Sequence, residues 1–313
     1  MNPVQLTDRQ ILSLRGPKAT LDPRRAYASA WEEERDAAGV LVPTGVVFLT
    51  NRECPFRCVM CDLWMHTLDD VIAEGLIPGQ IRTALAGLPA VQQVKLYNAG
   101  SFFDAQAIPP ADDKAIADVV GGCERVIVEA HPAYLRGPYA ERCLTFRSQL
   151  RGRLEVAIGL ETAEPGVLAQ LNKRMTLDDF SRAAGFLREH DIDVRAFILL
   201  QPPFMRADDA VEWGCRSIDF AFGAGASVCS VIPTRGGNGA MEAVGGAPPD
   251  LAALESVVEY GVLTGRGRVF ADVWDAERFF TCRCSAERAA RLRVMNRTQR
   301  IPLPVVCDCA TRH

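Results

Sequence analysis

The sequence lacks the features that mark membrane, secreted and strongly charged proteins. No apolar run approaches the roughly 20 residues that span a bilayer, and the chain does not open on a basic segment followed by an apolar one. The net charge is only −4, which gives no whole-molecule attraction for nucleic acid or an anionic membrane. Internal repeats and low-complexity tracts are also absent. We therefore expect a cytoplasmic protein that does not bind a membrane and whose partners are recognised by local sites.

The composition is that of a large globular protein with many thiols. The 313 residues are 48% hydrophobic and 24% charged, which is enough apolar material for a large core and gives no sign of disorder. Eleven cysteines occur in a chain without a secretory signal. Such cysteines indicate thiolate chemistry or metal binding rather than a disulfide framework.

Short β-branched runs alternate with helix-length amphipathic stretches. The runs that begin at Val156 and Ala196 are apolar on both faces, which is typical of buried parallel strands. The sequence therefore predicts an α/β fold, a partial parallel (β/α)6-type TIM barrel with a small cysteine-rich C-terminal extension. We expect strands at 45–50, 93–98, 125–130, 154–161, 193–200, 226–232 and 268–273.

Three regions follow from this pattern. We expect a helical or irregular lead-in over residues 1–42, the barrel over 43–272, and a metal- or cluster-binding extension over 273–313. In parallel barrels the chemistry gathers at the carboxyl ends of the strands. The residues that follow each strand are therefore the candidates for a site.

Three cysteines, Cys54, Cys58 and Cys61, follow the first of these strands within one short loop. Three thiolates can hold three irons of a [4Fe-4S] cluster and leave the fourth iron open to a small chelating molecule. A structural zinc site would need a fourth ligand, and His66 is close enough in the sequence to keep that alternative open. Three unrelated core cysteines are a further alternative.

The spacing of three and then two residues resembles the signature of the radical S-adenosylmethionine superfamily. Further segments resemble the branch that contains the Elongator catalytic subunit, the MiaB-like enzymes and archaeosine synthase, so that the resemblance covers about residues 46–241. It implies a [4Fe-4S] cluster on Cys54, Cys58 and Cys61 and S-adenosyl-L-methionine as cofactor. It also implies reductive cleavage of that cofactor to a 5'-deoxyadenosyl radical, which abstracts hydrogen from a substrate. The segments are 95–104, 128–132, 155–162, 172–173 and 199–204.

The resemblance also implies residues that bind the cofactor. Met60 stands where the family usually has an aromatic residue, and by resemblance it would contact adenine largely through its main chain. The turn of Asn98, Ala99, Gly100 and Ser101 occupies the place of the family's Gly-Gly-Glu motif, which holds the methionine amino group. Gly100 would permit close approach of the backbone. The alternative is an ordinary strand-to-helix turn with Ser101 as the helix N-cap.

Charged and amide side chains at later strand ends complete the predicted site. Glu129 and Glu161 each follow an apolar run, so their carboxylates are expected at the barrel mouth, where they could accept hydrogen bonds from ribose hydroxyls or the methionine ammonium. A helix cap or an ion pair with arginine is the alternative for each. Lys173 is expected to meet the methionine carboxylate, or else to be a surface lysine. Gln201 begins a stiff Gln-Pro-Pro-Phe turn that, by resemblance, wraps adenine.

A second cysteine group lies near the C-terminus. Two Cys-x-Cys pairs can close a tetrahedral zinc site or hold a second [4Fe-4S] cluster, and unligated thiols are the third alternative. The arginines between the pairs could grip phosphate or form a solvated helix face, and no aromatic residue for base stacking occurs in 285–306. The cysteines are Cys282, Cys284, Cys307 and Cys309, and the arginines are Arg288, Arg291, Arg293, Arg297 and Arg300.

The substrate and partners follow only from the resemblance. Archaeosine synthase suggests a modified nucleobase or a tRNA adduct, whereas the lack of a recognisable nucleic-acid module leaves a small metabolite or a peptide as an equal alternative. A reductant such as flavodoxin or ferredoxin is implied. The competing hypothesis is a zinc or iron-sulfur binding scaffold without catalytic activity.

Overall fold

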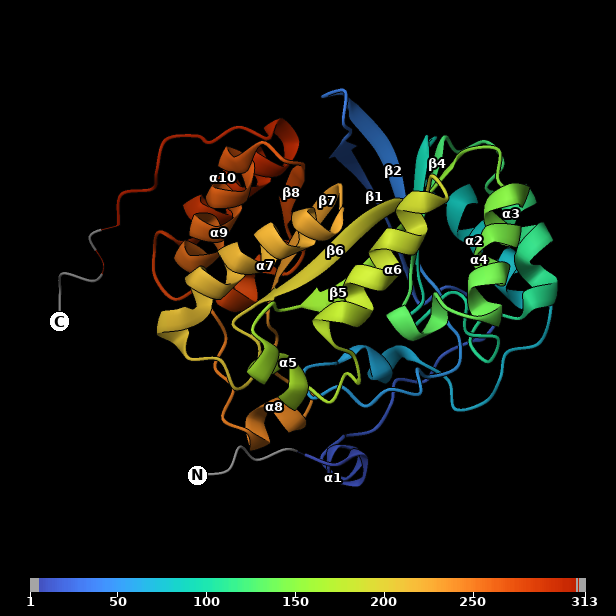
Figure 1. Ribbon diagram of the computed structural model, residues 1–313, viewed down its shortest axis with the longest axis horizontal. Coiled ribbons are helices and arrows are strands. Elements are labelled where there is room, and N and C mark those ends of the chain that lie inside the picture. The colour runs from blue at the N-terminus through green and yellow to red at the C-terminus, as the bar shows by residue number, and fades with distance from the viewer. Residues whose placement is uncertain (1–5, 308, 310–313) are drawn as a thin grey trace.

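The computed structural model describes residues 6–307 and 309, and its centre is one eight-stranded sheet. The strands lie in chain order, with β2 to β8 parallel and β1 antiparallel to β2 (Figure 1). The predicted partial parallel barrel is therefore confirmed, and each strand expected from the sequence is present. The strands are β1 (Ala28–Arg35), β2 (Leu41–Phe48), β3 (Gln93–Tyr97), β4 (Arg125–Glu129), β5 (Arg153–Glu161), β6 (Asp193–Leu200), β7 (Val228–Pro233) and β8 (Arg268–Ala271).

Helices cover the outer face of the curled sheet. In Figure 1, α2, α3 and α4 flank one side of the sheet, α7, α9 and α10 flank the other, and α6 lies between them. Their apolar sides and the sheet share one continuous core. The helices are α1 (Asp8–Ser13), α2 (Leu76–Ala86), α3 (Asp113–Val119), α4 (Pro138–Gln149), α5 (Pro165–Gln170), α6 (Leu177–Glu189), α7 (Ala210–Ala224), α8 (Ala240–Ala243), α9 (Leu251–Thr264) and α10 (Ser285–Thr298). Within the described residues, none of them has the length and hydropathy that a bilayer crossing requires.

The expected helical or irregular lead-in over residues 1–42 differs from the structure, because Ala28–Arg35 form strand β1. The segment is rich in Glu and Arg, which hides the period-two pattern of a strand from a reading based on hydrophobicity. Glu32 and Glu34 alternate with Trp31 and Glu33 along the strand. Both Glu32 and Glu34 form ion pairs with Lys95 in the barrel interior. The charges on this strand are therefore matched by tertiary partners that local sequence does not reveal.

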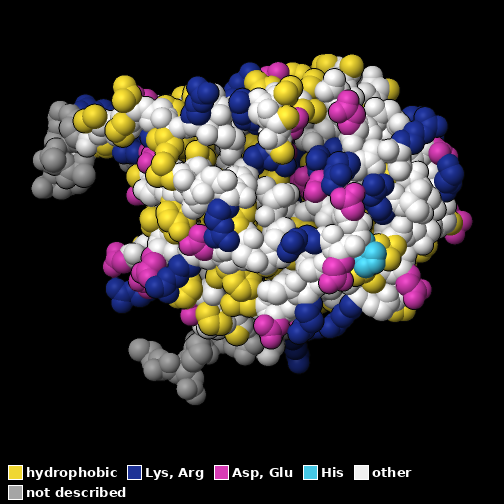
Figure 2. Space-filling model, turned by 45° about the horizontal axis from the view of Figure 1, so that its top comes forward, with side chains coloured by type: hydrophobic (Ala, Val, Ile, Leu, Met, Phe, Trp, Pro, Cys, Tyr) yellow, Lys and Arg dark blue, Asp and Glu magenta, His cyan; other side chains and the backbone are white. Residues whose placement is uncertain are grey.

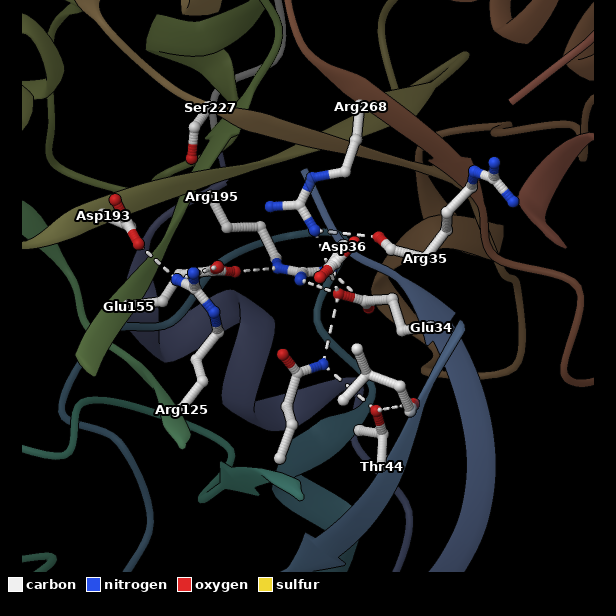
Figure 3. Close-up of polar contacts among 12 residues, drawn as sticks. Glu34, Arg35, Asp36, Thr44, Arg125, Glu155, Asp193, Arg195, Ser227 and Arg268 are labelled. Atoms are coloured by element: carbon white, nitrogen blue, oxygen red, sulfur yellow. Dashed lines mark hydrogen bonds and ion pairs between the residues drawn. The ribbon is translucent and has the colours of Figure 1, made fainter. Parts of the chain in front are cut away.

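An ion-pair network fills the end of the barrel where the parallel strands begin (Figure 3). Arg195 of β6 lies 2.6 Å from both Glu34 of β1 and Glu155 of β5, and Lys95 of β3 lies 2.6 Å from Glu34. Arg268 of β8 donates a hydrogen bond to the main-chain carbonyl of Arg35 in β1 at 2.9 Å, which links the first and last strands. Because this end of the barrel is packed with paired charges, the opposite end, where the strands terminate, carries the candidate site.

Candidate active site

The three predicted thiols lie in the loop of residues 51–64 that follows β2, called here the three-cysteine loop. Cys54, Cys58 and Cys61 are each partly exposed. Burial raises the pKa of the Cys54 thiol to about 11 and that of Cys61 to about 12, and it raises the pKa of Cys58 as well. Thiolates are therefore unfavourable here unless a bound cation compensates their charge, which is the role of iron in a cluster.

Two distant asparagine side chains hold the main chain of this loop. Asn172 donates to the carbonyl of Arg57 at 2.7 Å, and Asn238 donates to the carbonyls of Val59 at 2.8 Å and Cys61 at 3.1 Å. Sequence reasoning missed both as loop-holding residues. Neither has a sequence signal of its own for this role, because each depends on a contact across the barrel mouth.

A segment before β1 covers the loop on its outer side. Within this N-terminal strap, residues 6–19, Ile11 is 1% exposed and belongs to a small apolar cluster with Val59 of the loop and Ala240 of α8. Arg15 also forms a 2.6 Å ion pair with Glu53 of the loop. The strap therefore packs against the three-cysteine loop through both apolar and charged contacts.

The turn of Asn98, Ala99, Gly100 and Ser101 lies directly against the thiols. A Cβ at Gly100 would stand 3.2 Å from the Cβ of Cys54, so the backbone of this turn approaches Cys54 closely, while its approach to a cofactor stays a prediction. Within the described residues, both amide atoms of Asn98 and the hydroxyl of Ser101 are buried without a hydrogen-bond partner. Buried polar atoms are normally satisfied. A bound molecule with an ammonium and a carboxylate group fits these unpartnered atoms.

Glu129 holds this turn through hydrogen bonds to its main chain. Its Oε1 atom accepts hydrogen bonds from the main-chain amides of Asn98 at 2.5 Å and Gly100 at 3.4 Å. Burial raises the pKa of the Glu129 carboxyl to about 7, and these amide hydrogen bonds oppose that shift. The geometry therefore gives Glu129 a role in shaping the turn of residues 98–101, and the predicted contact with ribose or ammonium stays a prediction for its second oxygen.

Glu161 and Lys173, both expected at the site, form a buried ion pair. Burial alone would lower the pKa of Lys173, but Glu161 and the thiol of Cys58 outweigh it, so that pKa is raised and the amine stays charged. Gly159 makes room for the pair, because a Cβ there would overlap both charged groups. Lys173 is 8% exposed, so the alternative of a surface lysine is wrong.

His131 is a further residue that the sequence reading did not assign. Its ring stacks on Phe56 of the three-cysteine loop with a centroid distance of 3.9 Å. Its Nδ1 accepts from the amide of Ala133 at 3.1 Å, and its Nε2 lies 3.0 Å from the carbonyl of Lys173. Burial and the charge of Lys173 lower the pKa of His131 to about 3. A neutral imidazole therefore fastens the loop to the Lys173 segment.

The remaining predicted contacts lie at the edge of this arrangement. Gln201 adopts a φ of 53° and donates to the carbonyl of Ala247 at 3.1 Å, so it anchors a neighbouring loop in this structure. Met60 is partly buried against the core. His66 stacks on Tyr27 at 4.9 Å, and within residues 6–307 and 309 it forms no compact ligand group with the three cysteines. The zinc alternative for this loop therefore gains no fourth ligand from His66.

The C-terminal cysteines come together, whereas the arginines beside them are paired. The Sγ atoms of Cys282, Cys284, Cys307 and Cys309 all lie within 4.8 Å of one another, and we call these residues the four-thiol group. Four of the five arginines have acidic partners, which weakens the phosphate-binding alternative, whereas no ion pair is found for Arg300 within the described residues. These ion pairs are Arg288 with Glu255, Arg291 with Glu255 and Glu259, Arg293 with Glu277, and Arg297 with Glu33.

Comparison of the fold with solved structures shows which class of protein the chain resembles. No known family model matches the sequence. The crystal structure of methylornithine synthase superposes with a TM-score of 0.52 over 96% of this chain and 95% of that chain, at 12% sequence identity. At this identity the likeness establishes the shared barrel fold.

Sequence relatives then narrow the comparison. Archaeosine synthase subunit beta of Methanosarcina acetivorans is 26% identical over 232 residues, 71% of this chain and 65% of the relative. The subunit of the same name from Thermococcus kodakarensis is 29% identical over 200 residues, 60% of this chain and 61% of the relative. The chain thus spans less than two thirds of each relative. These findings confirm the resemblance to the radical S-adenosylmethionine superfamily and to the branch that includes archaeosine synthase.

Proposed function

We propose that this protein is a radical S-adenosylmethionine enzyme. A [4Fe-4S] cluster would be held by Cys54, Cys58 and Cys61, and S-adenosyl-L-methionine would coordinate the fourth iron. The observation that carries the proposal is the close approach of Gly100 to Cys54, in a turn whose Asn98 and Ser101 side chains have buried, unpartnered polar atoms. A scaffold has no use for buried, unpartnered polar atoms at this place, because each costs about 1–3 kcal/mol.

The residues around the thiols have distinct tasks in this proposal. Asn98 and Ser101 would bind the ammonium and carboxylate of the methionine part. Glu129 keeps their turn in place by accepting hydrogen bonds from the main-chain amides of the turn. Lys173, held charged by Glu161, provides the positive charge for the methionine carboxylate. Gln201 and Met60 stay proposed contacts of adenine. When bound, the cluster supplies one electron, received from a flavodoxin or ferredoxin, that cleaves the cofactor to a 5'-deoxyadenosyl radical.

For the substrate we propose a modified nucleobase or a tRNA adduct, as the names of the sequence relatives suggest. The alternative is a small metabolite or a peptide, and one observation favours it. The face in Figure 2 shows Lys and Arg side chains interspersed with Asp and Glu, without a broad area of one sign. On this face, and at the paired arginines of α10, little phosphate-binding surface is therefore offered. If the substrate is tRNA, we propose that a partner subunit grips the RNA.

Cluster content and cofactor cleavage test the enzyme proposal directly. After anaerobic reconstitution, we expect iron and sulfide on the three-cysteine loop, an EPR spectrum that changes when S-adenosyl-L-methionine is added, and release of 5'-deoxyadenosine under reducing conditions. Cys54→Ala should abolish that release, whereas Cys215→Ala, at a cysteine of α7 outside both groups, should preserve it. The proposal would be overturned if Cys54→Ala still cleaved the cofactor, or if the EPR spectrum did not change when S-adenosyl-L-methionine was added.

A gel-shift titration separates the substrate alternatives. If the chain recognises tRNA unaided, it should shift tRNA at low salt and lose affinity steeply as salt rises. No shift at low salt would exclude unaided tRNA binding and favour the small-substrate alternative or a partner-dependent tRNA reaction. Repeating the titration with an added partner subunit distinguishes those two.

A further inference from the structure

The four-thiol group joins two segments at the C-terminal side of the molecule. Cys282 and Cys284 directly precede α10, and Cys307 and Cys309 belong to the segment that returns after it. The Sγ atoms of Cys282 and Cys307 are 3.8 Å apart, and so are those of Cys284 and Cys309. Each sulfur of one segment thus faces a sulfur of the other. A disulfide would require about 2.05 Å, so these are not bonded pairs.

These distances discriminate between a single metal ion and a four-iron cluster. Around a single zinc ion with Zn–S bonds of about 2.3 Å, a tetrahedron places its sulfur atoms about 3.8 Å apart. In a [4Fe-4S] cluster each thiolate binds a different iron at a separate corner, so the sulfur atoms must stand much farther apart than around one ion. All four sulfurs here lie within 4.8 Å of one another. The spacing therefore suits one tetrahedral ion and is too small for a cubane.

The three-cysteine loop offers an internal contrast. Among the described residues, Cys54, Cys58 and Cys61 do not form a group as compact as the C-terminal one. The same chain therefore holds its two sets of thiols at different spacings. This difference is expected if one set spreads over a cluster and the other surrounds a single ion.

The surroundings of the four-thiol group form a built site. The hydroxyl of Ser285 accepts hydrogen bonds from the amides of Thr281 and Cys282, both at 3.1 Å, and so shapes the first segment. Arg291, which is 6% exposed, donates to the carbonyls of Pro302 at 2.8 Å and Leu303 at 2.7 Å. This arginine pins the returning segment to α10. The two pairs of cysteines are therefore positioned by hydrogen bonds that do not depend on the thiols.

A positive charge also lies next to the thiols. Arg288 of α10 pairs with Glu255 of α9 and contacts the side chain of Cys307. Four thiolates around one Zn²⁺ carry a net charge of −2, and a neighbouring guanidinium reduces the cost of that charge. Arg288 thus has a structural partner on one side and an anionic site on the other.

We propose that Cys282, Cys284, Cys307 and Cys309 bind one Zn²⁺ ion in a closed tetrahedral site. Four protein ligands leave no open position for substrate, so the site is structural. It fastens the segment after α10 to the start of that helix. The proposal does not depend on the radical activity, because it concerns a different metal on different residues.

Metal analysis of the whole chain tests the site. Anaerobically purified protein should contain about one zinc per chain. The double variant Cys284→Ala/Cys309→Ala should lose that zinc and keep the iron of the three-cysteine loop, and the control Cys215→Ala should keep both metals. The proposal would be overturned if the double variant retained its zinc. It would also be overturned if the double variant lost iron and not zinc.

A second measurement on the unaltered chain covers the case in which the double variant fails to fold. Protein produced with cobalt in place of zinc should show the visible absorption of tetrahedral Co²⁺ bound to thiolates. A chain that takes up no cobalt and holds about eight irons would instead carry a second cluster, contrary to the proposal. Cys54→Ala should lose iron while retaining zinc, so the failure of the radical mechanism and the failure of the zinc site are separate results.

Discussion

The side-chain amide of Asn238 lies 3.1 Å from the main-chain carbonyl of Cys61, although 177 positions separate the two residues. The same amide also donates to the carbonyl of Val59. Asn238 is 2% exposed, and its Oδ1 atom accepts from the amide of Met241 at 2.8 Å. A single buried side chain thus joins the loop that carries the thiols to the segment that begins α8.

Removing this amide should loosen the loop. We expect Asn238→Ala to lower the free energy of unfolding by about 1–3 kcal/mol, because two loop carbonyls lose their donor. Its iron content after anaerobic reconstitution and gel filtration should fall below that of the unaltered chain. The control is Asn296→Ala, which removes two 2.8 Å hydrogen bonds between α10 and Ala271 of β8. If both variants keep the same iron content, Asn238 has no special role in holding the cluster.

Substitution of Gly159 should disturb the buried ion pair of Glu161 and Lys173. A Cβ at residue 159 would overlap both charged groups, so Gly159→Ala must displace them. We expect at least about tenfold weaker binding of S-adenosyl-L-methionine, which corresponds to about 1.4 kcal/mol, in equilibrium dialysis. Gly185→Ala is the matched control, since its Cβ on α6 meets nothing within 4 Å. Unchanged cofactor affinity in Gly159→Ala would argue against a role of the pair in binding.

The buried carboxyl of Glu129 should make stability depend on pH. Its pKa rises from 4.5 to about 7 on folding, mainly through burial, so the folded state binds the proton more tightly than the unfolded state. Its contribution to stability is therefore complete below about pH 4.5 and is lost as the pH rises through about 7. The loss is on the order of 3 kcal/mol. Denaturant unfolding of the apoprotein at several pH values should show this decline, and Glu129→Gln should reduce it. An identical pH profile in both proteins would contradict the assignment.

The N-terminal strap should protect the cluster from oxygen. Ile11 is 1% exposed against Val59 and Ala240, and an aspartate there would bury an unpaired charge or expel the strap. We expect Ile11→Asp to bleach several-fold faster in air, followed by visible absorbance. Leu12→Asp is the control, because its side chain is 46% exposed on the same helix. Equal bleaching rates in the two variants would show that the strap does not shield the thiols.

The ion-pair network of Arg195 should contribute strongly to stability. Arg195→Met would leave the buried carboxylates of Glu34 and Glu155 without their shared partner, which costs about 3–5 kcal/mol. Arg216→Met breaks an exposed pair with Glu212 and should cost less than about 1 kcal/mol. Chemical unfolding monitored by circular dichroism compares the two. Similar losses in both variants would mean that Lys95 and Arg125 compensate the two carboxylates without Arg195.

The strands of the barrel could be predicted because their residues carry a local signal. The run over β6 is apolar and rich in branched side chains, and the structure places that strand at Asp193–Leu200, the predicted span. Strand β1 could not be predicted in this way, since its inward Glu34 is satisfied only by Arg195 and Lys95 from other strands. Charge in a strand becomes intelligible only when its partners are known.

By itself, the sequence determined the alternation that builds a parallel barrel, the cysteine spacing that indicates an iron-sulfur cluster, and the candidate residues at the strand ends. These features depend on side-chain periodicity and on ligands close together in the chain. Only the tertiary structure decided that Lys173 meets Glu161, that Asn238 holds the carbonyl of Cys61, and that four C-terminal sulfurs lie at the spacing of a single ion. Each of these depends on distances between segments far apart in the chain, which are set by the packing of the whole barrel.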